Sequence, residues 1–148
     1  MSVFAVSSKH SGNMEADIAK AMRRMYIIVH KTTLDMFSRV IKRTPVDSGR
    51  TRGNWQYAVG SPPSGVLDEL DKSGSGVISG IANDIQGWDP VITAYLANNV
   101  PWILKLENGG YGKGEKTTGG FSKQAPRGMV KITVAEFETL LKKAGING

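Results

Sequence analysis

Side chains that could hold a metal or carry out catalysis are sparse in this 148-residue chain. It contains no cysteine, and its two histidines, His10 and His30, lie far apart in the sequence. Transition-metal sites usually combine closely spaced histidine and cysteine ligands, because several donors must converge on one ion. We therefore predict no metal site, no disulfide and no redox chemistry.

Two other segments resemble reactive sites in composition only. Asp68, Glu69 and Asp71 cluster in a connection rich in serine and glycine, where a charged run is usually solvated. Residues 109–114 are glycine-rich like a phosphate-binding loop, but they lack the Gly-Lys-Ser/Thr ending and no strand leads directly into them. We predict no catalytic residue and no cofactor, so the chain is not expected to be an enzyme.

Cations and aromatic rings alternate in one region, which suggests nucleic-acid binding. Between residues 42 and 57, four Lys/Arg residues precede Trp55 and Tyr57. Single-strand binders use cations for phosphates and aromatic rings for stacking on bases. However, Trp55 and Tyr57 also fall on one face of a predicted strand, where a hydrophobic core would bury both rings. A basic accessory protein that binds DNA or RNA is therefore the alternative from outside the structural class.

The net charge of +6 is distributed unevenly along the chain. Residues 1–55 carry ten Lys/Arg and four Asp/Glu, residues 56–110 carry two and six, and residues 111–148 carry seven and three. Complementary patches of this kind steer association between proteins as well as with nucleic acid. The alternation favours packing of one subunit head to tail on another, with an ordinary solvated surface as the alternative.

The length of the chain is typical of a single domain, residues 1–148. The first twelve residues lack the continuous apolar region of a secretory signal, and no run of about 18 apolar residues occurs anywhere. We therefore expect neither secretion nor a membrane span.

The first half of the chain predicts one long helix followed by a strand. Residues 1–12 are rich in serine and small residues and are expected to form a flexible arm. Asn13 can cap a helix over residues 14–43, in which apolar residues recur every three or four positions. Pro45 must end this helix, and a turn at 47–49 leads into a strand over 55–59.

The second half predicts shorter elements. A short helix is expected around residues 77–85, and the β-branched run 91–96 is typical of a central strand. A helical turn over 102–107 precedes a glycine-rich loop, residues 108–124. Pro126 is suited to begin the last helix, which Gly145 would end. The predicted fold is therefore α+β, with the long N-terminal helix and the C-terminal helix packed on one face of a small antiparallel or mixed β-sheet.

Three sequence elements follow one another from residue 44 onward. Residues 44–55 read Thr-Pro-Val-Asp-Ser-Gly-Arg-Thr-Arg-Gly-Asn-Trp, and residues 98–110 read Asn-Asn-Val-Pro-Trp-Ile-Leu-Lys-Leu-Glu-Asn-Gly-Gly. Residues 122–130 read Ser-Lys-Gln-Ala-Pro-Arg-Gly-Met-Val and introduce the last helix. In this order they resemble the tail-component family of tailed bacteriophages, whose members are small neck and tail-completion proteins.

The resemblance gives the matching residues a structural role, in turns and in the core that present assembly surfaces. These residues are Pro45, Asp47, Gly49, Arg50, Trp55, Asn99, Pro101, Trp102, Glu107, Gly109, Pro126 and Gly128. Many relatives are shorter between Tyr111 and Phe121, and we predict that residues 108–124 form a docking loop that is disordered until a neighbouring ring arrives. Tyr111 and Phe121 would anchor it, while Lys113, Lys116 and Lys123 meet an acidic surface or phosphate; a passive loop is the alternative.

The resemblance also implies a function. It implies a non-enzymatic virion protein that is assembled in the host cytoplasm into a homo-oligomeric ring, six-fold or twelve-fold, at the head-tail junction. Its partners would be the connector or head-completion protein and the tail-tube or tail-terminator protein, with transient contact to passing DNA and none to a membrane. The alternative within this class is a tail terminator that caps the tail tube.

Overall fold

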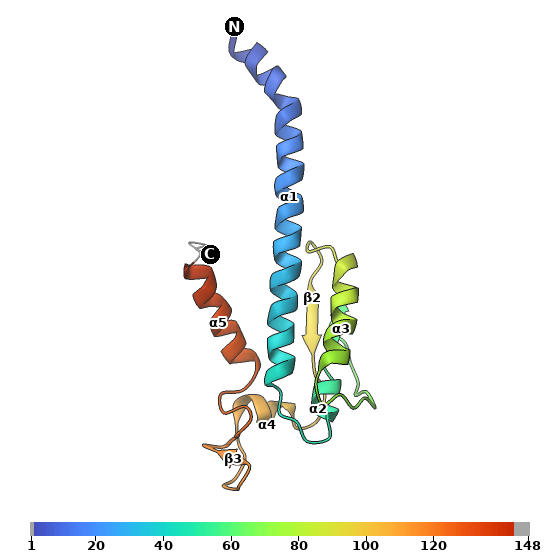
Figure 1. Ribbon diagram of the computed structural model, residues 1–148, viewed down its shortest axis with the longest axis vertical. Coiled ribbons are helices and arrows are strands. Elements are labelled where there is room, and N and C mark those ends of the chain that lie inside the picture. Colours follow the sequence, from blue (N-terminus) through green and yellow to red (C-terminus); the bar gives the residue numbers. More distant parts are fainter. Residues whose placement is uncertain (1, 144–148) are drawn as a thin grey trace. The chain divides into compact units, whose positions relative to one another are not determined.

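The computed structural model describes residues 2–143 and divides the chain into two compact units, Met1–Thr32 and Thr33–Gly148. The first unit contains helix only, and all the strands and the other helices belong to the second unit. Helices and short antiparallel strands alternate along the chain, so the predicted α+β class is confirmed (Figure 1).

Helix α1, Ser2–Arg43, is the longest element and ends as predicted just before Pro45. Its start differs from the prediction, because residues 2–12 are helical and Asn13 lies inside the helix instead of capping it. Residues 2–12 contain no proline, and one glycine costs a helix only about 1 kcal/mol. The richness of residues 1–12 in serine and small side chains was therefore not enough to predict a flexible arm.

A short helix, α2 at Arg50–Gly53, follows the predicted turn and was missed by the sequence reasoning. The turn depends on Gly49, whose φ of 92° lies in the left-handed region that favours glycine. A β-carbon at Gly49 would also lie 2.7 Å from the backbone nitrogen of Lys72. Ser48 Oγ accepts the Arg50 N–H at 3.3 Å and so helps to hold the turn.

Strands β1, Gln56–Val59, and β2, Ala94–Ala97, form an antiparallel pair in which Tyr57 lies opposite Leu96. The first strand is confirmed, but the second is shorter than predicted and is not central, because its sheet has two strands. Asp89 explains the late start: its carboxylate and its carbonyl accept the N–H groups of Val91 and Ile92, which holds both residues in a turn. Val91 is 83% exposed as a result.

Two further helices lie where the sequence predicted them. Helix α3, Ser75–Asp84, continues into a short 3₁₀ turn, η1 at Ile85–Gly87. Helix α4, Ile103–Asn108, is the predicted helical turn after Pro101.

The glycine-rich segment is not a structureless loop. Strands β3, Thr117–Thr118, and β4, Phe121–Ser122, pair as a hairpin with glycines at positive φ in its turn. Pro126 does not begin the last helix, because residues 125–128 form a turn and α5 runs over Val130–Lys143. The predicted stop at Gly145 lies outside the described residues.

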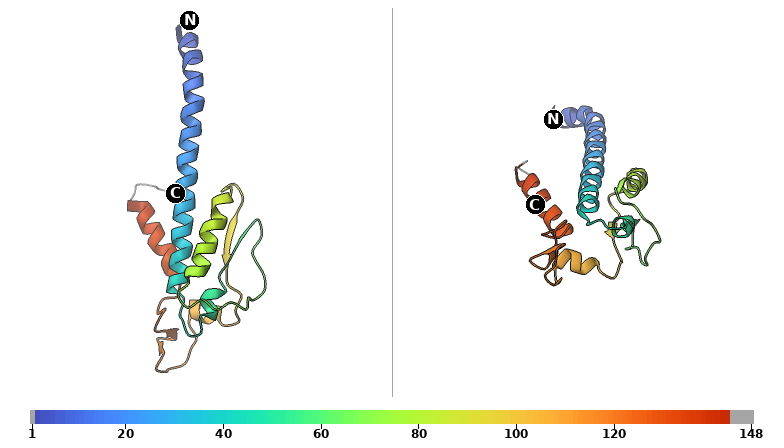
Figure 2. Two further views of the ribbon diagram at one scale, coloured as in Figure 1. Left: turned by 45° about the vertical axis from the view of Figure 1, so that its right-hand side comes forward. Right: turned by 60° about the horizontal axis from the view of Figure 1, so that its bottom comes forward.

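The core of the second unit is built mainly between helices (Figure 2). It combines residues from the end of α1, from α3 and α4, and from the segments before β1 and α5: Val40, Ile41, Trp55, Ile81, Leu106, Ala125 and Met129. The predicted fold, a long N-terminal helix and a C-terminal helix with a small antiparallel sheet, is thus confirmed, and the structure adds a second two-stranded sheet.

Candidate interaction surface

The three sequence elements meet in the second unit at a junction that we call the motif hub, formed by residues 44–55, 98–110 and 122–130. Within the first element, Trp55 is 6% exposed and its indole N–H donates to Thr44 Oγ1 at 2.8 Å. The same hydroxyl donates to the Val40 carbonyl at 2.8 Å. Trp55 therefore fixes the chain direction after α1 as well as filling the core.

Arg52 supports the same turn and was missed as a structural residue. Its guanidinium donates to the carbonyls of Thr44 at 2.8 Å, Lys72 at 2.8 Å and Lys42 at 2.6 Å. Burial lowers its pKa, and the negative charge of Asp71 opposes that effect. A cation that bonds to three backbone carbonyls can cross-link segments that are distant in sequence. The only feature of the sequence that could have indicated this role of Arg52 was its position within the first element.

The second element is joined to the first through Thr51. Asn98 Nδ2 donates to the Thr51 carbonyl, and the Trp102 indole N–H donates to Thr51 Oγ1, each at 2.8 Å. Asn99 Nδ2 reaches the carbonyls of Pro63 and Gly65. Trp102 is 37% exposed, so its ring lies at the surface of the hub, not in the core as predicted.

The second element is joined to the third by the Glu107 carboxylate. It accepts the N–H groups of Met129 at 2.8 Å, Val130 at 2.9 Å and Lys131 at 2.9 Å. These are donors that the first turn of α5 cannot satisfy itself, and a negative charge there is favourable. Gly128 permits the approach, because a β-carbon on it would lie 2.6 Å from the Glu107 carbonyl.

Gln124 closes the hub by joining the third element to the first. Its side-chain Oε1 accepts the Val46 N–H at 2.8 Å, and its Nε2 donates to the Val46 carbonyl at 3.0 Å. Ala125 and Met129 beside it are buried, whereas Pro126 is exposed. All three elements are thus linked pairwise by side-chain hydrogen bonds.

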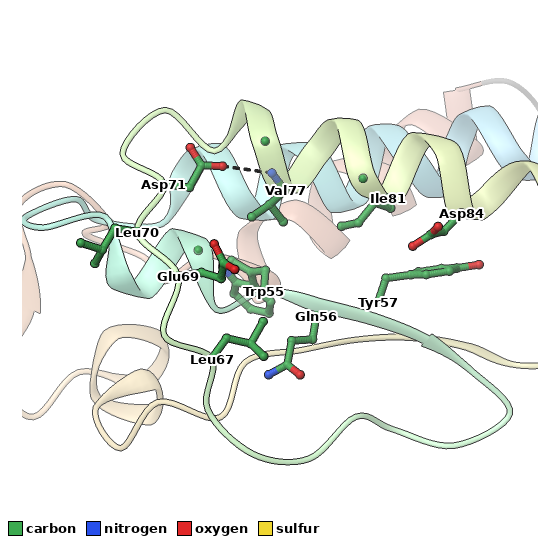
Figure 3. Close-up of a pocket in the computed structure, with 13 residues that line it drawn as sticks. Trp55, Gln56, Tyr57, Leu67, Glu69, Leu70, Asp71, Val77, Ile81 and Asp84 are labelled. Carbon is green, nitrogen blue, oxygen red and sulfur yellow. Dashed lines mark hydrogen bonds between the residues drawn. The ribbon is translucent and has the colours of Figure 1, made fainter.

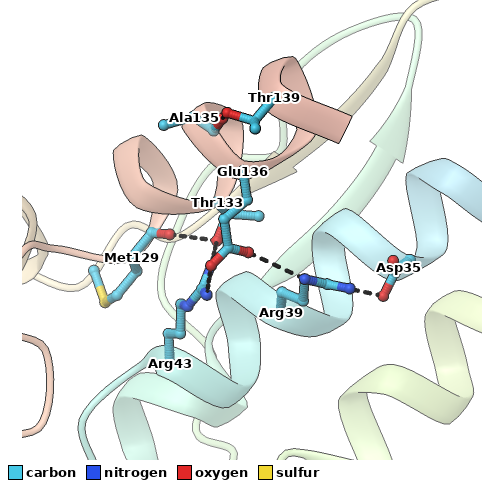
Figure 4. Close-up of polar contacts among 8 residues, drawn as sticks. All are labelled: Asp35, Arg39, Arg43, Met129, Thr133, Ala135, Glu136 and Thr139. Atoms are coloured by element: carbon cyan, nitrogen blue, oxygen red, sulfur yellow. Dashed lines mark hydrogen bonds and ion pairs between the residues drawn. The ribbon is translucent and has the colours of Figure 1, made fainter. Parts of the chain in front are cut away.

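An ionic network attaches α5 to the final turns of α1 (Figure 4). Glu136 pairs with Arg43 and also with Arg39, whose Nη1 lies 3.1 Å from its carboxylate. The hydrogen bond from Arg43 is the main cause of the lowered pKa of Glu136. Arg43 also donates to the buried Thr133 hydroxyl at 2.8 Å. Because Glu136 lies more than 90 residues from both arginines in the sequence, local spacing could not predict this network.

The two aromatic anchors of the predicted docking loop pack against their own chain. Tyr111 is partly buried against the core, and its N–H donates to the Gly120 carbonyl at 2.9 Å. The Phe121 ring lies against Gly109, where a β-carbon would be 3.1 Å from the ring. The expectation that residues 108–124 are disordered in the free subunit is therefore corrected. Three exposed lysines remain on the hairpin segment, namely Lys113, Lys116 and Lys123.

A hollow of about 580 Å³, which we call the hairpin groove, lies between the hub and the hairpin. Trp102 and Tyr111 line it together with Lys116 and Lys123. The groove thus combines residues that we predicted as structural with residues that we predicted for docking. Asp47 and Glu115 line it as well, so the groove offers aromatic rings with charges of both signs.

A second hollow of about 660 Å³, the acidic groove, lies between α3 and β1 and is lined by Glu69, Asp71 and Asp84 (Figure 3). Desolvation raises the pKa of Asp71, but hydrogen bonds from the N–H groups of Val77 and Gly74 outweigh it and hold this pKa below its usual value. Asp71 therefore stays charged while it caps α3, at 3.0 Å from the Val77 nitrogen. The sequence interpretation of this carboxylate as merely solvated is corrected.

The cation and aromatic cluster between residues 42 and 57 is largely used inside the protein. Arg43 and Arg52 bond to Glu136 and to backbone carbonyls, as described above, and Arg50 lies 3.6 Å from Asp68. Tyr57 contacts Phe37 edge to face, with ring centroids 6.3 Å apart. Stacking on bases would need these rings to be open, so the cluster gives little support to nucleic-acid binding.

The part of the chain that the structure describes holds no group of three or more His, Asp or Glu side chains arranged to bind a metal. None of its helices combines the length and apolarity needed to cross a membrane. Comparisons of the chain with protein-family models, curated protein sequences and solved structures give no match.

Proposed function

We propose that the protein is a structural component of a tailed phage, a neck or tail-completion protein that forms a ring at the head-tail junction. The observation that carries this proposal is the motif hub. Three elements that resemble the tail-component family, distant in sequence, are linked pairwise by the side chains of Thr51, Glu107 and Gln124. Elements used to build one rigid junction suit a protein whose task is to present surfaces to its neighbours.

Subunits of such a ring would contact one another head to tail. The hairpin of β3 and β4 and the helix α3 lie on opposite sides of the second unit (Figures 1 and 2). The hairpin carries lysines, and residues of α3 line the acidic groove. A surface of one sign on one side and of the other sign on the opposite side favours a heterologous contact, which closes into a ring when the rotation allows. Lys113, Lys116 and Lys123 would then face Glu69 and Asp84 of the next subunit.

The ring would be part of the virion and would be assembled in the host cytoplasm. Its faces would meet the connector or head-completion protein on one side and the tail on the other, and DNA would pass through its centre. A hairpin already ordered in the subunit can dock without the entropic cost of folding a loop.

Removal of the gene from the phage genome that encodes this chain tests the proposal. We expect filled heads and tails of normal length that fail to join, with joining restored by the wild-type protein supplied in trans. Overlong tails would indicate the tail terminator instead. Normal infectious particles would contradict any role in the neck.

A further inference from the structure

The first unit exposes a row of large apolar side chains along α1. Five of them are at least half exposed: Met14 58%, Ile18 55%, Met22 50%, Met25 64% and Ile28 61%. Soluble proteins seldom leave such a continuous apolar strip uncovered unless it is an interaction site. A single helix also gains most of its stability from packing its apolar face, which this segment lacks within its own unit.

The row occupies one side of the helix. At about 100° per residue, the five side chains fall within an arc of about 120°. The four cations of residues 13–32 fall on the other side: Lys20, Arg23, Arg24 and Lys31. Two copies can therefore bring their apolar sides together without bringing these cations into the contact.

We propose that residues 13–32 of α1 pair with the same residues of a second copy of this chain as an antiparallel two-helix coiled coil. Ile18, Met22, Met25 and Val29 follow one another at intervals of four, three and four residues, which is the spacing of a coiled-coil seam. In the antiparallel register that centres this seam, Ile18 of one copy lies beside Val29 of the other, and Met22 lies beside Met25.

The charges select the antiparallel direction. Glu15 and Asp17 lie near one end of the segment and Lys31 near the other. Antiparallel pairing places Lys31 at the height of Glu15 and Asp17 of the second copy, and Arg23 and Arg24 are the cations that then meet like charges at their own height. Parallel pairing would place every charged residue of the segment at the height of the same residue in the other copy. Opposed helix dipoles favour the same direction.

This contact is isologous, because the same patch is used by both copies. It therefore differs from the heterologous ring contact and does not rest on the proposed function. It joins two subunits in solution, or subunits of two facing rings, through residues that the second unit does not contain.

The full chain carrying both Met22→Glu and Met25→Glu tests the pairing by light-scattering mass measurement. We expect an even number of copies for the wild type and half that mass for the variant. Ile27→Glu is the matched control, because Ile27 is 54% exposed but lies on the opposite side of the helix. A wild-type mass of one copy, an unchanged mass of the double variant, or an equal loss in the control overturns the proposal.

Single cysteines test the direction cleanly because the chain has none of its own. Under mild oxidation, a mixture of Ile18→Cys and Val29→Cys proteins should form the mixed disulfide, while Ile18→Cys alone should stay largely uncrosslinked. Efficient self-crosslinking of Ile18→Cys would show parallel helices and overturn the proposal. Because these readouts do not depend on phage particles, they can fail independently of the proposed function.

A lipid surface is the competing occupant of an amphipathic cationic helix. Binding to vesicles of phosphatidylcholine that contain anionic phosphatidylglycerol, measured for the wild type and the double variant, distinguishes a lipid surface from a second copy of the chain. Pairing predicts that the mass of the protein in buffer changes in the double variant. Vesicle binding that the double variant loses, with no change of its mass in buffer, assigns the row to a membrane surface and overturns the proposal.

Discussion

At the scale of single residues, a few polar side chains hold the second unit together over long distances in sequence. Glu107, Arg52 and Gln124 each bond to backbone atoms of another segment. Backbone groups at a turn must find partners, so a side chain that satisfies several of them fixes the position of the whole turn.

The Glu107 cap should contribute measurably to stability. Glu107→Ala removes the acceptor of three N–H groups at the start of α5, and we expect a loss of about 1–2 kcal/mol in the free energy of unfolding. Glu115→Ala, on the exposed hairpin, is the control and should change it by less than about 0.5 kcal/mol. Chemical denaturation measures both, and equal effects would contradict the capping role.

The two hub tryptophans should differ. Trp55→Ala empties a buried site and should cost about 3–5 kcal/mol. Trp102→Ala should cost clearly less, because its ring is 37% exposed and loses mainly one hydrogen bond to Thr51. Thermal melts would reveal the order, and a larger loss for Trp102 would show that its exposed ring is covered in the assembled protein.

Asp71 should make stability depend on acid pH. The pKa of its carboxyl is lowered in the folded state, so its contribution is present above the unfolded pKa and is lost as the pH falls through the folded value. Glu136 also has a lowered pKa and titrates in the same direction. Asp71→Asn should therefore flatten the decline in unfolding free energy below about pH 4 without abolishing it. An unchanged decline would argue against the cap.

At the scale of elements, different residues of the hairpin pack against the protein and carry its charge. Tyr111 and Phe121 fix it to the second unit, whereas the ammonium groups of Lys113, Lys116 and Lys123 form no ion pair in the part of the chain that the structure describes. An element fixed by its aromatic residues can present cations without depending on them for its own fold.

Reversal of the hairpin charges tests this separation. The triple variant Lys113→Glu, Lys116→Glu and Lys123→Glu should melt within a few degrees of the wild type, because all three side chains are exposed. It should lose ring formation, since like charges would face the acidic groove. Lys142→Glu, an exposed lysine of α5, is the control. Rings formed normally by the triple variant would exclude the head-to-tail contact proposed above.

The elements that could be predicted from the sequence are those set by local chemistry. Pro45 ends α1 because its backbone cannot continue the helix, and Tyr57 lies in a strand because its neighbours alternate. The hairpin was missed because its glycines suggest freedom, whereas Tyr111 and Phe121 supply its anchors only once the chain has folded.

The sequence predicted which residues belong to the candidate site, but not which of them contact one another. The sequence selected Glu107 and Gly128 through the phage-like pattern, yet their pairing joins segments about 20 residues apart and has no local signal. The contacts of Arg52 and Glu136 likewise have no local signal, because Lys72 and Arg43, their partners, are distant in sequence. Tertiary hydrogen bonds of this kind follow from the fold and not from local spacing.

At the scale of the whole molecule, the two units would have different tasks. The second unit contains the motif hub and both grooves, and through them it would make the ring. The first unit is a helix whose apolar row would pair with a second copy. A chain with two separate contact surfaces can assemble in steps, because each surface can be occupied without the other.

The most direct test of the central claim is electron cryo-microscopy of purified particles of the phage that encodes this chain, with a tag at its C-terminus. We expect cyclic density at the head-tail junction into which residues 33–143 fit, with the hairpin of each subunit against the acidic groove of the next and the tag label confined to this ring. Particles that lack the protein, or that carry it as a single copy or elsewhere in the virion, would contradict the account.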